Sequence, residues 1–298
     1  MKTIVAATDL SEGARLAAAR AAMVAKDHGA ALHLVHVISS SALNDLRQFF
    51  RTSGAVEANL IDDAKRLVDE AAERIRADTG VVARTEIKTG HALTSILESA
   101  ASADLLVLGA HGANHLHDLV LGTTAERLLA TCKRPILVVK RPPMGRYERV
   151  LVPVDFSSFS APALNVVGRI AGDAQVTMIH AFRVPFEARL RIAGASDLEI
   201  ERCCERERQD ALEKMRHLVI GGGNDARRIG FDVRRGDPSR VILAKETQAS
   251  SDLIVIGKQG DSVVGDLLMG SVTYQVLAGS KCDVLVVHND SRLSSDNV

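Results

Sequence analysis

The sequence predicts an α/β protein with two tandem, open, parallel five-stranded sheets, Rossmann-like, with helices on both faces of each sheet. Three observations lead to this fold class. Short β-rich runs alternate with helix-length segments, several of these runs are continuously apolar, and the second half of the chain repeats the order of the first. Continuously apolar strands are typical of parallel sheets covered by helices, and a fixed repeat indicates duplicated domains.

In the first half, β-branched and apolar runs predict strands, and longer segments with helical spacing of apolar residues predict helices. The sequence runs LLVL and ILVV contain no polar residue, as expected of strands that helices cover on both faces. The expected strands are 3–7, 32–38, 81–88, 105–108 and 136–139, and the expected helices are 14–28, 56–78, 92–101 and 124–131.

The second half follows the same order of strand and helix. The expected strands are 149–154, 175–181, 230–234, 253–256 and 284–287, and the expected helices are 161–171, 197–219, 239–247 and 272–278. Equivalent features lie 146 to 148 residues apart, for example Asp9 with Asp155 and Gly109 with Gly257. An offset this constant indicates an internal duplication.

The segment KRPPMGRYER at 140–149 separates the two halves. Its Pro142, Pro143 and Gly145 cannot continue a central strand, because proline removes a ladder donor and glycine weakens the strand. We therefore expect one domain at 1–141 and a second at 148–290.

Composition limits the possible functions. The chain has 298 residues, 46% of them hydrophobic and 25% charged, which fits two ordinary soluble domains. Its 37 basic and 37 acidic residues cancel, so we expect neither nucleic acid nor an anionic membrane as a partner. No apolar run approaches the length of a membrane span and the chain opens without a secretion signal, so a cytoplasmic protein is expected.

The cysteines give the same expectation for the compartment. They lack zinc-binding spacing and form no evident disulfide framework, so reduced thiols are expected. They are Cys132, Cys203, Cys204 and Cys282.

Two glycine motifs of identical spacing, G-x2-G-x9-G-[S/T], occur once in each half. Each follows a predicted strand, and its last glycine precedes a predicted helix. Glycines let the backbone approach an anion closely, and free N–H groups at a helix start favour negative charge. A hydroxyl there can bind phosphate or a phosphate-bound Mg²⁺. The motifs are formed by Gly109, Gly112, Gly122 and Thr123, and by Gly257, Gly260, Gly270 and Ser271.

The first strand of each half ends in a carboxylate, Asp9 or Asp155. In open α/β sheets the ligand lies beyond the carboxyl ends of the strands, where the strand order reverses. If the first strand neighbours the fourth, these carboxylates face the glycine loops and can accept a hydrogen bond from a base amino group or a sugar hydroxyl. The alternative is that each aspartate caps the helix that follows it.

These motifs, with AATDLS and VPVDFS at the strand ends and LVHVI before a long helix, resemble the universal stress protein family in its tandem two-domain form. The resemblance covers the chain from Lys2 to about Val287. It implies the strand order 3-2-1-4-5 and places the chain in the subgroup that binds ATP, with Mg²⁺, through the glycine loop.

The resemblance also implies one nucleotide site in each domain. Asp9 and Val37, the latter through its backbone, match adenine contacts of the first site. The expected binding residues of the first site are Ala7, Asp9, Val37, Gly109, His111, Gly112, Gly122, Thr123 and Thr124. Those of the second site are Pro153, Asp155, Ala181, Gly257, Lys258, Gly260, Gly270, Ser271 and Val272.

The two sites differ in ways that predict unequal affinities. Lys258 stands where the first half has Ala110, and it either adds Coulombic attraction for phosphate or remains solvated. Residues 123–126 read as a capping box, so Thr123 has a purely structural alternative. The first half has Gly-His-Ala at 90–92 where the second keeps Gly-Asp-Pro at 236–238.

Histidines in the first glycine loop allow a metal site as an alternative. His111, His115, His117 and Asp118 crowd this loop, but the second half does not repeat them, so we expect no metal bound by side chains. Histidines that face solvent or phosphate are the expectation instead.

We find no catalytic motif: no nucleophile elbow, no Walker loop and no dinucleotide fingerprint. The leading hypothesis is a cytoplasmic ATP-binding regulator of stress responses with little turnover and an unknown protein partner. The alternatives are a slow ATPase or phosphotransfer enzyme, and a nucleotide-free dimeric scaffold. The resemblance also implies that the fifth strands, 136–139 and 284–287, can form a homodimer.

Overall fold

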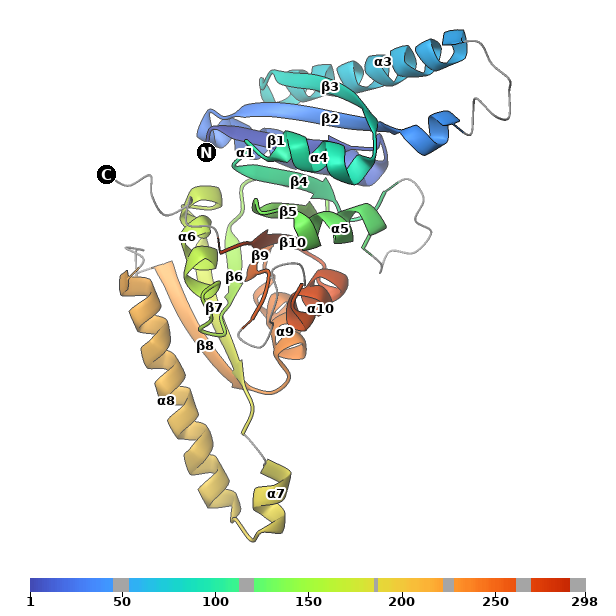
Figure 1. Ribbon diagram of the computed structural model, residues 1–298. Coiled ribbons are helices and arrows are strands. Elements are labelled where there is room, and N and C mark those ends of the chain that lie inside the picture. The colour runs from blue at the N-terminus through green and yellow to red at the C-terminus, as the bar shows by residue number, and fades with distance from the viewer. Residues whose placement is uncertain (45–53, 113–120, 185–186, 222–227, 261–268, 290–298) are drawn as a thin grey trace. The chain divides into compact units, whose positions relative to one another are not determined.

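The chain folds into two units of the same architecture, Met1–Arg146 and Tyr147–Val298 (Figure 1). The computed structural model describes residues 1–44, 54–112, 121–184, 187–221, 228–260 and 269–289. Each unit is a parallel sheet with helices on both faces, so the predicted fold class is confirmed. No helix among these described ranges is long and apolar enough to cross a membrane.

In the first unit the strands lie in the order β3-β2-β1-β4-β5 and pair in parallel. Helices α1 and α3 pack together on one face, and α4 and α5 pack together on the other. The elements are β1 Thr3–Thr8, α1 Glu12–His28, β2 Ala31–Ser39, α3 Gly54–Thr79, β3 Ala83–Gly90, α4 Ala92–Ala100, β4 Leu105–Gly109, α5 Thr123–Thr131 and β5 Ile136–Val139.

Helix α1 shows why these elements form where they do. Ser11 is its N-cap and accepts a hydrogen bond from the N–H of Ala14, and Gly29 ends it in the left-handed conformation. Its alanines are buried against β1 and β4 and allow the helix to pack close to the sheet. The strand residues beneath, such as Ile4 and Leu105, are fully buried.

The second unit repeats this order as β8-β7-β6-β9-β10. Helices α9 and α10 pack together, and α6 contacts α8. The elements are β6 Arg149–Pro153, α6 Ser160–Ile170, β7 Gln175–Phe182, α7 Glu187–Ile192, α8 Asp197–Gly221, β8 Ile229–Arg235, α9 Pro238–Ala249, β9 Leu253–Gly257, α10 Ser271–Gly279 and β10 Asp283–Val287.

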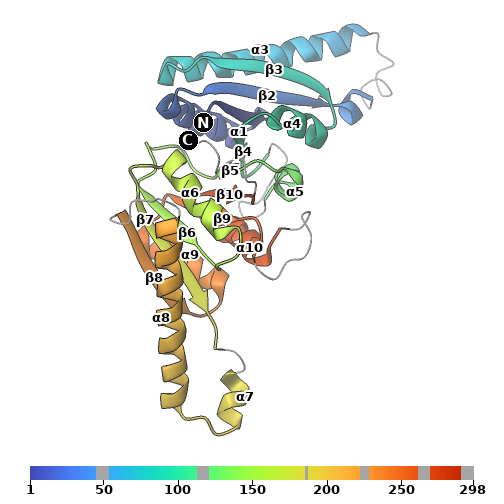
Figure 2. The ribbon, with the colours of Figure 1, turned by 60° about the vertical axis from the view of Figure 1, so that its left-hand side comes forward.

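Helix α7 was not predicted from the sequence. It is short, and Figure 2 shows it beside the end of α8 that extends beyond the sheet. Ion pairs hold this corner together: Arg191 bridges Glu187 and Asp197, and Arg235 of β8 pairs with Glu187.

An aspartate before the fourth strand ties the start of the first strand in both units. Asp104 accepts hydrogen bonds from the backbone N–H groups of Lys2 and Thr3. Asp252 does the same for Glu148 and Arg149, at 2.8 and 3.0 Å. These bonds fix where β1 and β6 enter their sheets.

Glu246 of α9 fixes the start of β10. Its side chain is only 5% exposed, and Oε1 accepts the backbone N–H groups of Lys281 and Cys282, both at 2.7 Å. Two hydrogen bonds to a charged acceptor offset the cost of burying the carboxyl group.

The end of the first unit is bound to helix α1. Arg20, 4% exposed, donates from Nη1 to the carbonyl oxygen of Gly145 at 2.6 Å. Arg146 pairs with Asp27 at 2.8 Å. The segment after β5 therefore packs on the first unit, whose boundary lies beyond Arg141.

Candidate nucleotide-binding sites

The first unit contains a cavity of about 430 Å³ at the carboxyl ends of β1, β2 and β4. Ala7 and Asp9 come from the end of β1, and Thr123 and Thr124 from the first turn of α5. All predicted residues of the first site line this cavity. The full lining is Ala7, Thr8, Asp9, Ala14, Val37, Ser39, Ala92, Ile96, Leu108, Gly109, Ala110, His111, Gly112, Gly122, Thr123, Thr124, Ala125 and Leu128.

The second unit has an equivalent cavity of about 260 Å³. Every predicted residue of the second site lines it except Lys258, which is 3% exposed and not part of the lining. The alternative of a solvated lysine is therefore wrong. The lining is Pro153, Val154, Asp155, Phe159, Ser160, Ile179, Ala181, Pro238, Ile242, Ile256, Gly257, Gln259, Gly260, Gly270, Ser271, Val272 and Thr273.

The second glycine of each motif lies against the strand-end aspartate. A β-carbon on Gly112 would lie 2.6 Å from Oδ2 of Asp9, and one on Gly260 would lie 2.5 Å from Oδ2 of Asp155. These distances are far below van der Waals contact, so only glycine leaves room for the carboxylate at the loop. The predicted meeting of aspartate and glycine loop is found in both units.

The first glycine of each motif serves packing instead. A β-carbon on Gly109 would lie 2.6 Å from the carbonyl carbon of Gly13, and one on Gly257 would lie 2.5 Å from Cβ of Phe159. The helix after the first strand approaches the end of the fourth strand too closely for any side chain. These glycines are required by the fold itself.

The third glycine of each motif is the N-cap of a helix. Gly122 precedes α5 and Gly270 precedes α10, and neither helix has a side-chain cap bond. Thr123 is the first residue inside its helix, so the predicted capping box at 123–126 is wrong. The side chains of Thr123 and Ser271 are exposed at these helix starts, where N–H groups and the helix dipole favour an anion.

A left-handed residue follows the aspartate in both units. Leu10 has φ 66° and Phe156 has φ 65°. This conformation costs a non-glycine residue about 1–2 kcal/mol, and such strain is concentrated at functional sites. The residue types gave no sign of it, and the signal was only that both positions follow the repeated aspartate.

The aspartates close turns and do not cap helices. Oδ1 of Asp9 accepts the N–H of Ser11 at 3.0 Å, and Oδ1 of Asp155 accepts that of Ser157 at 3.0 Å. The N-caps are Ser11 for α1 and Phe159 for α6. The capping alternative for the aspartates is therefore wrong.

Two histidines beside the sites were missed from the sequence. Nδ1 of His36 bonds the carbonyl oxygen of Thr8 at 2.8 Å, and Nδ1 of His180 bonds that of Val154 at 2.8 Å. Because a carbonyl only accepts, each Nδ1 carries the proton. Their equivalent places in the repeat, LVHVI and MIHAF, were the available signal.

The turns after the third strands differ as their sequences do. Asp237 caps α9 by accepting the N–H of Arg240 at 3.2 Å, whereas His91 makes no side-chain cap bond for α4. Hydrogen bonds from the Ser239 hydroxyl and the Arg240 N–H hold the pKa of Asp237 below its usual value. Pro238, which follows Asp237, lines the second cavity.

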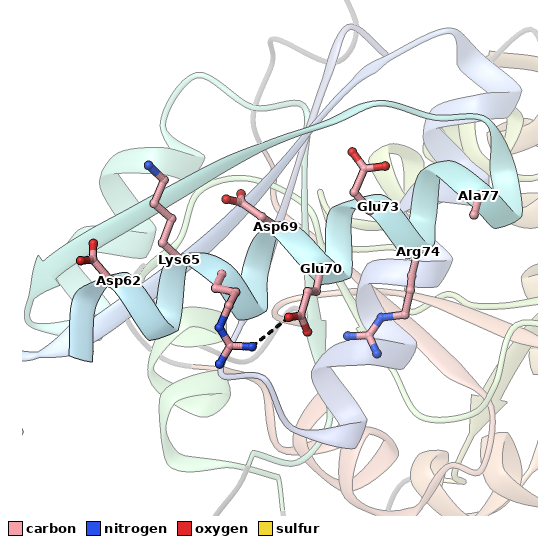
Figure 3. A pocket seen from close by; sticks show the side chains of 8 residues that line it. Asp62, Lys65, Asp69, Glu70, Glu73, Arg74 and Ala77 are labelled. Carbon is pink, nitrogen blue, oxygen red and sulfur yellow. Dashed lines mark hydrogen bonds and ion pairs between the residues drawn. The ribbon is translucent and has the colours of Figure 1, made fainter. Parts of the chain in front are cut away.

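A hollow of different character runs along α3 (Figure 3). Its lining comes from this helix alone, and Arg66 pairs there with Asp63 and Glu70 on exposed side chains. Arg66 donates hydrogen bonds to both carboxylates, and these bonds, first that to Glu70, raise the pKa of Arg66. Alternating charges on one exposed helix face are typical of a solvated surface, and we place no site here.

Metal-binding side chains are a separate question. Within the described ranges, no group of three or more His, Cys, Asp or Glu residues could hold a metal ion. His111 lines the first cavity, while His115, His117 and Asp118 lie outside the described residues.

Comparison with known proteins identifies the family to which both units belong. The model of the universal stress protein family matches residues 1–140 and 146–288. The universal stress protein Rv2623 of Mycobacterium tuberculosis is 24% identical over 95% of both chains. The universal stress protein MJ0531 of Methanocaldococcus jannaschii is 30% identical over 143 residues, which are 47% of this chain and 82% of that protein.

The fold has solved counterparts. The crystal structure of a universal stress protein from Archaeoglobus fulgidus superposes with a TM-score of 0.70 at 21% identity, covering 97% of this chain and 98% of that one. Two successive domain matches, full-length relatives and the repeated α/β units lead to one conclusion: the chain belongs to the universal stress protein family, as a member with two domains in tandem.

Proposed function

We propose that this protein is a cytoplasmic, ATP-binding regulator of stress responses, with one nucleotide site in each domain and little turnover. The observation that supports it is a set of three features that occurs in both units: a strand-end aspartate, a glycine beside it and an exposed hydroxyl at a helix start. A loop that only joined a strand to a helix would need neither the aspartate, nor the glycine beside it, nor the hydroxyl to be gathered around a cavity.

The phosphates would lie at the N-termini of α5 and α10. Glycine N-caps without side-chain bonds leave the first-turn N–H groups for an anion. Thr123 and Thr124 in one site, and Ser271 in the other, supply hydroxyls for phosphate or for a Mg²⁺ ion bound to it. The ion would arrive with the nucleotide, since phosphate oxygens are the usual ligands of Mg²⁺.

The base and sugar would lie toward the strand ends. Val37 and Ala7 in the first cavity, and Ala181 and Pro153 in the second, give apolar surface and backbone polar groups. Oδ2 of Asp9 or Asp155 faces the glycine loop and would accept a hydrogen bond from the nucleotide. Apolar walls with a few placed polar groups are typical of small-molecule sites.

Little turnover is proposed because few lining groups can handle a proton. Among the described residues, the ionisable side chains that line the cavities are Asp9 and His111 in the first and Asp155 in the second. Phosphoryl transfer needs a residue that orients the attacking water.

A slow ATPase is the second candidate, and His111 is the observation that favours it. Gln259 takes the equivalent place in the second cavity, so hydrolysis would be confined to the first site. Phosphate release that persists in Gly260→Ala but stops in His111→Gln would support this candidate.

The proposal includes a cytoplasmic location and a homodimer. All four cysteines are free thiols, which suits a reducing compartment. A homodimer through the fifth strands β5 and β10 follows from the family resemblance and from their β-branched residues. Sedimentation equilibrium tests it, and a monomeric mass would remove it.

Native mass spectrometry of the full chain with ATP and Mg²⁺ tests the main proposal. Two bound nucleotides are expected in the wild type, and one in each of the variants Gly112→Ala and Gly260→Ala. No adduct at millimolar ATP would leave the nucleotide-free scaffold as the function.

A further inference from the structure

Two serine hydroxyls hold the carboxylate of Asp155. Its Oδ1 accepts the Ser157 hydroxyl at 2.6 Å and the Ser160 hydroxyl at 3.0 Å, besides the Ser157 N–H. Ser160 also accepts the N–H of Asp155 at 3.3 Å. Both serines are buried while Asp155 itself is exposed, so the part-buried bonds tie the carboxylate at the cavity to the inside of the turn.

The bonds leave the other carboxylate oxygen for a ligand. Oδ2 of Asp155 is the atom that faces Gly260 at the loop. With three donors on Oδ1, the plane of the carboxylate is set, and so is the direction in which Oδ2 can accept a hydrogen bond. A group fixed before binding loses less entropy when the ligand arrives.

The first unit is built differently at this point. Ala14 lines the first cavity and lies in the first turn of α1. Ser160 lines the second cavity and is the first residue of α6. Alanine has no hydroxyl, and the Ser11 hydroxyl accepts the N–H of Ala14 to cap α1. The pair of serine hydroxyls on the carboxylate thus belongs to the second unit.

We propose that Ser160 is a positioning residue of the second site: it acts through Asp155 and makes that site the tighter of the two for ATP. This inference rests on the proposed function. It adds the residue that distinguishes the two sites and the direction of their difference.

A double-mutant cycle in the full chain tests it. Both dissociation constants for ATP with Mg²⁺ would be measured by calorimetry for the wild type, Ser160→Ala, Asp155→Ala and the double variant. Ser160→Ala should weaken only the second site, by about tenfold, the effect of losing one hydrogen bond to a charged group. In the Asp155→Ala background the same change should have no effect.

Two matched variants separate positioning from folding. Ser160→Thr keeps the hydroxyl and should restore binding to near the wild-type value. Ser158→Ala removes an exposed hydroxyl from the same turn and should change neither constant. A crystal structure of Ser160→Ala without nucleotide should show the Asp155 carboxylate turned away from its wild-type direction.

Additive effects in the cycle would overturn the inference, as would unchanged affinity in Ser160→Ala or an unmoved carboxylate in its crystal structure. Those results would leave the proposed function intact, because the wild type still binds ATP. Absence of ATP binding by the wild-type second site would overturn both.

Discussion

Oδ2 of Asp155 lies 2.5 Å from the position that a β-carbon on Gly260 would take, and Asp9 stands in the same relation to Gly112 at 2.6 Å. The neighbour is the end of a flexible side chain, so a methyl group would displace the carboxylate without disturbing the backbone. This relation separates Gly112 and Gly260, which lie against a carboxylate, from Gly109 and Gly257, which close packing with Gly13 and Phe159 requires.

Gly260→Ala should therefore weaken ATP binding at the second site and leave the fold intact. The added methyl group turns Asp155 away and narrows the approach to α10. Isothermal titration should show at least a tenfold loss of affinity, the scale of one charged hydrogen bond. Gly257→Ala, by contrast, should lower the melting temperature.

Gly168→Ala is the matched control for this prediction. Gly168 is in α6, and a β-carbon there would meet nothing within 4 Å. Alanine should raise the stability by about 0.5–1 kcal/mol through helix propensity and leave binding unchanged. Lost binding in this variant would contradict a local effect at Gly260.

Glycine should be tolerated better than a β-branched residue at Leu10, which is the opposite of their order within an ordinary strand. Its φ of 66° favours glycine and opposes a β-branched side chain. Leu10→Val should be less stable than Leu10→Gly by about 1–2 kcal/mol in urea unfolding, the usual cost of left-handed strain. Equal stabilities would show that the turn relaxes.

Removing the Glu246 carboxylate should be costly. Glu246→Ala removes the acceptor of two N–H groups, that of Lys281 in a part-buried place and that of Cys282 in a buried one. We expect a loss of about 2–4 kcal/mol in the free energy of unfolding, from about 1–3 kcal/mol for each unsatisfied group with partial relaxation. Glu207→Ala, exposed on α8, should cost little by the same measurement.

Asp104 should make stability depend on acid pH. Burial raises the pKa of this carboxyl, but the N–H groups of Lys2 and Thr3 with the charges of the N-terminus and Arg134 outweigh it, so the pKa lies below its usual value. A carboxyl whose pKa is lower in the folded state stabilises the protein at any pH above its pKa in the unfolded state. This stabilisation is lost as the pH falls through its pKa in the folded state.

Asp104→Asn should accordingly be less stable than the wild type near neutral pH, and the difference should shrink below about pH 4, the ordinary range of an aspartate. Urea unfolding of both proteins at several pH values measures it. A difference that stays constant down to the lowest pH would mean that the charge of Asp104 plays no part.

The sequence predicted the strands, most helices and part of the lining of both cavities, because apolar runs and the glycine motif are local signals. It did not predict the left-handed Leu10 and Phe156, since neither residue type favours that conformation. The burial of Lys258 and the bond of His180 depend on which segments meet in the fold, and the bonds of Ser160 depend on the exact path of the turn after Asp155. The capping box failed because the N-cap of α5 is Gly122 and not Thr123.

The hydrogen bond from Arg20 to the carbonyl oxygen of Gly145 determines where the first domain can be cut. A fragment that stops at Arg141 would deprive a buried guanidinium of this acceptor and would also remove Arg146 from Asp27. A fragment that ends at Arg146 keeps both. A fragment of the first domain, whether made by a protease or by a stop codon, should therefore include the proline-containing stretch at 140–146.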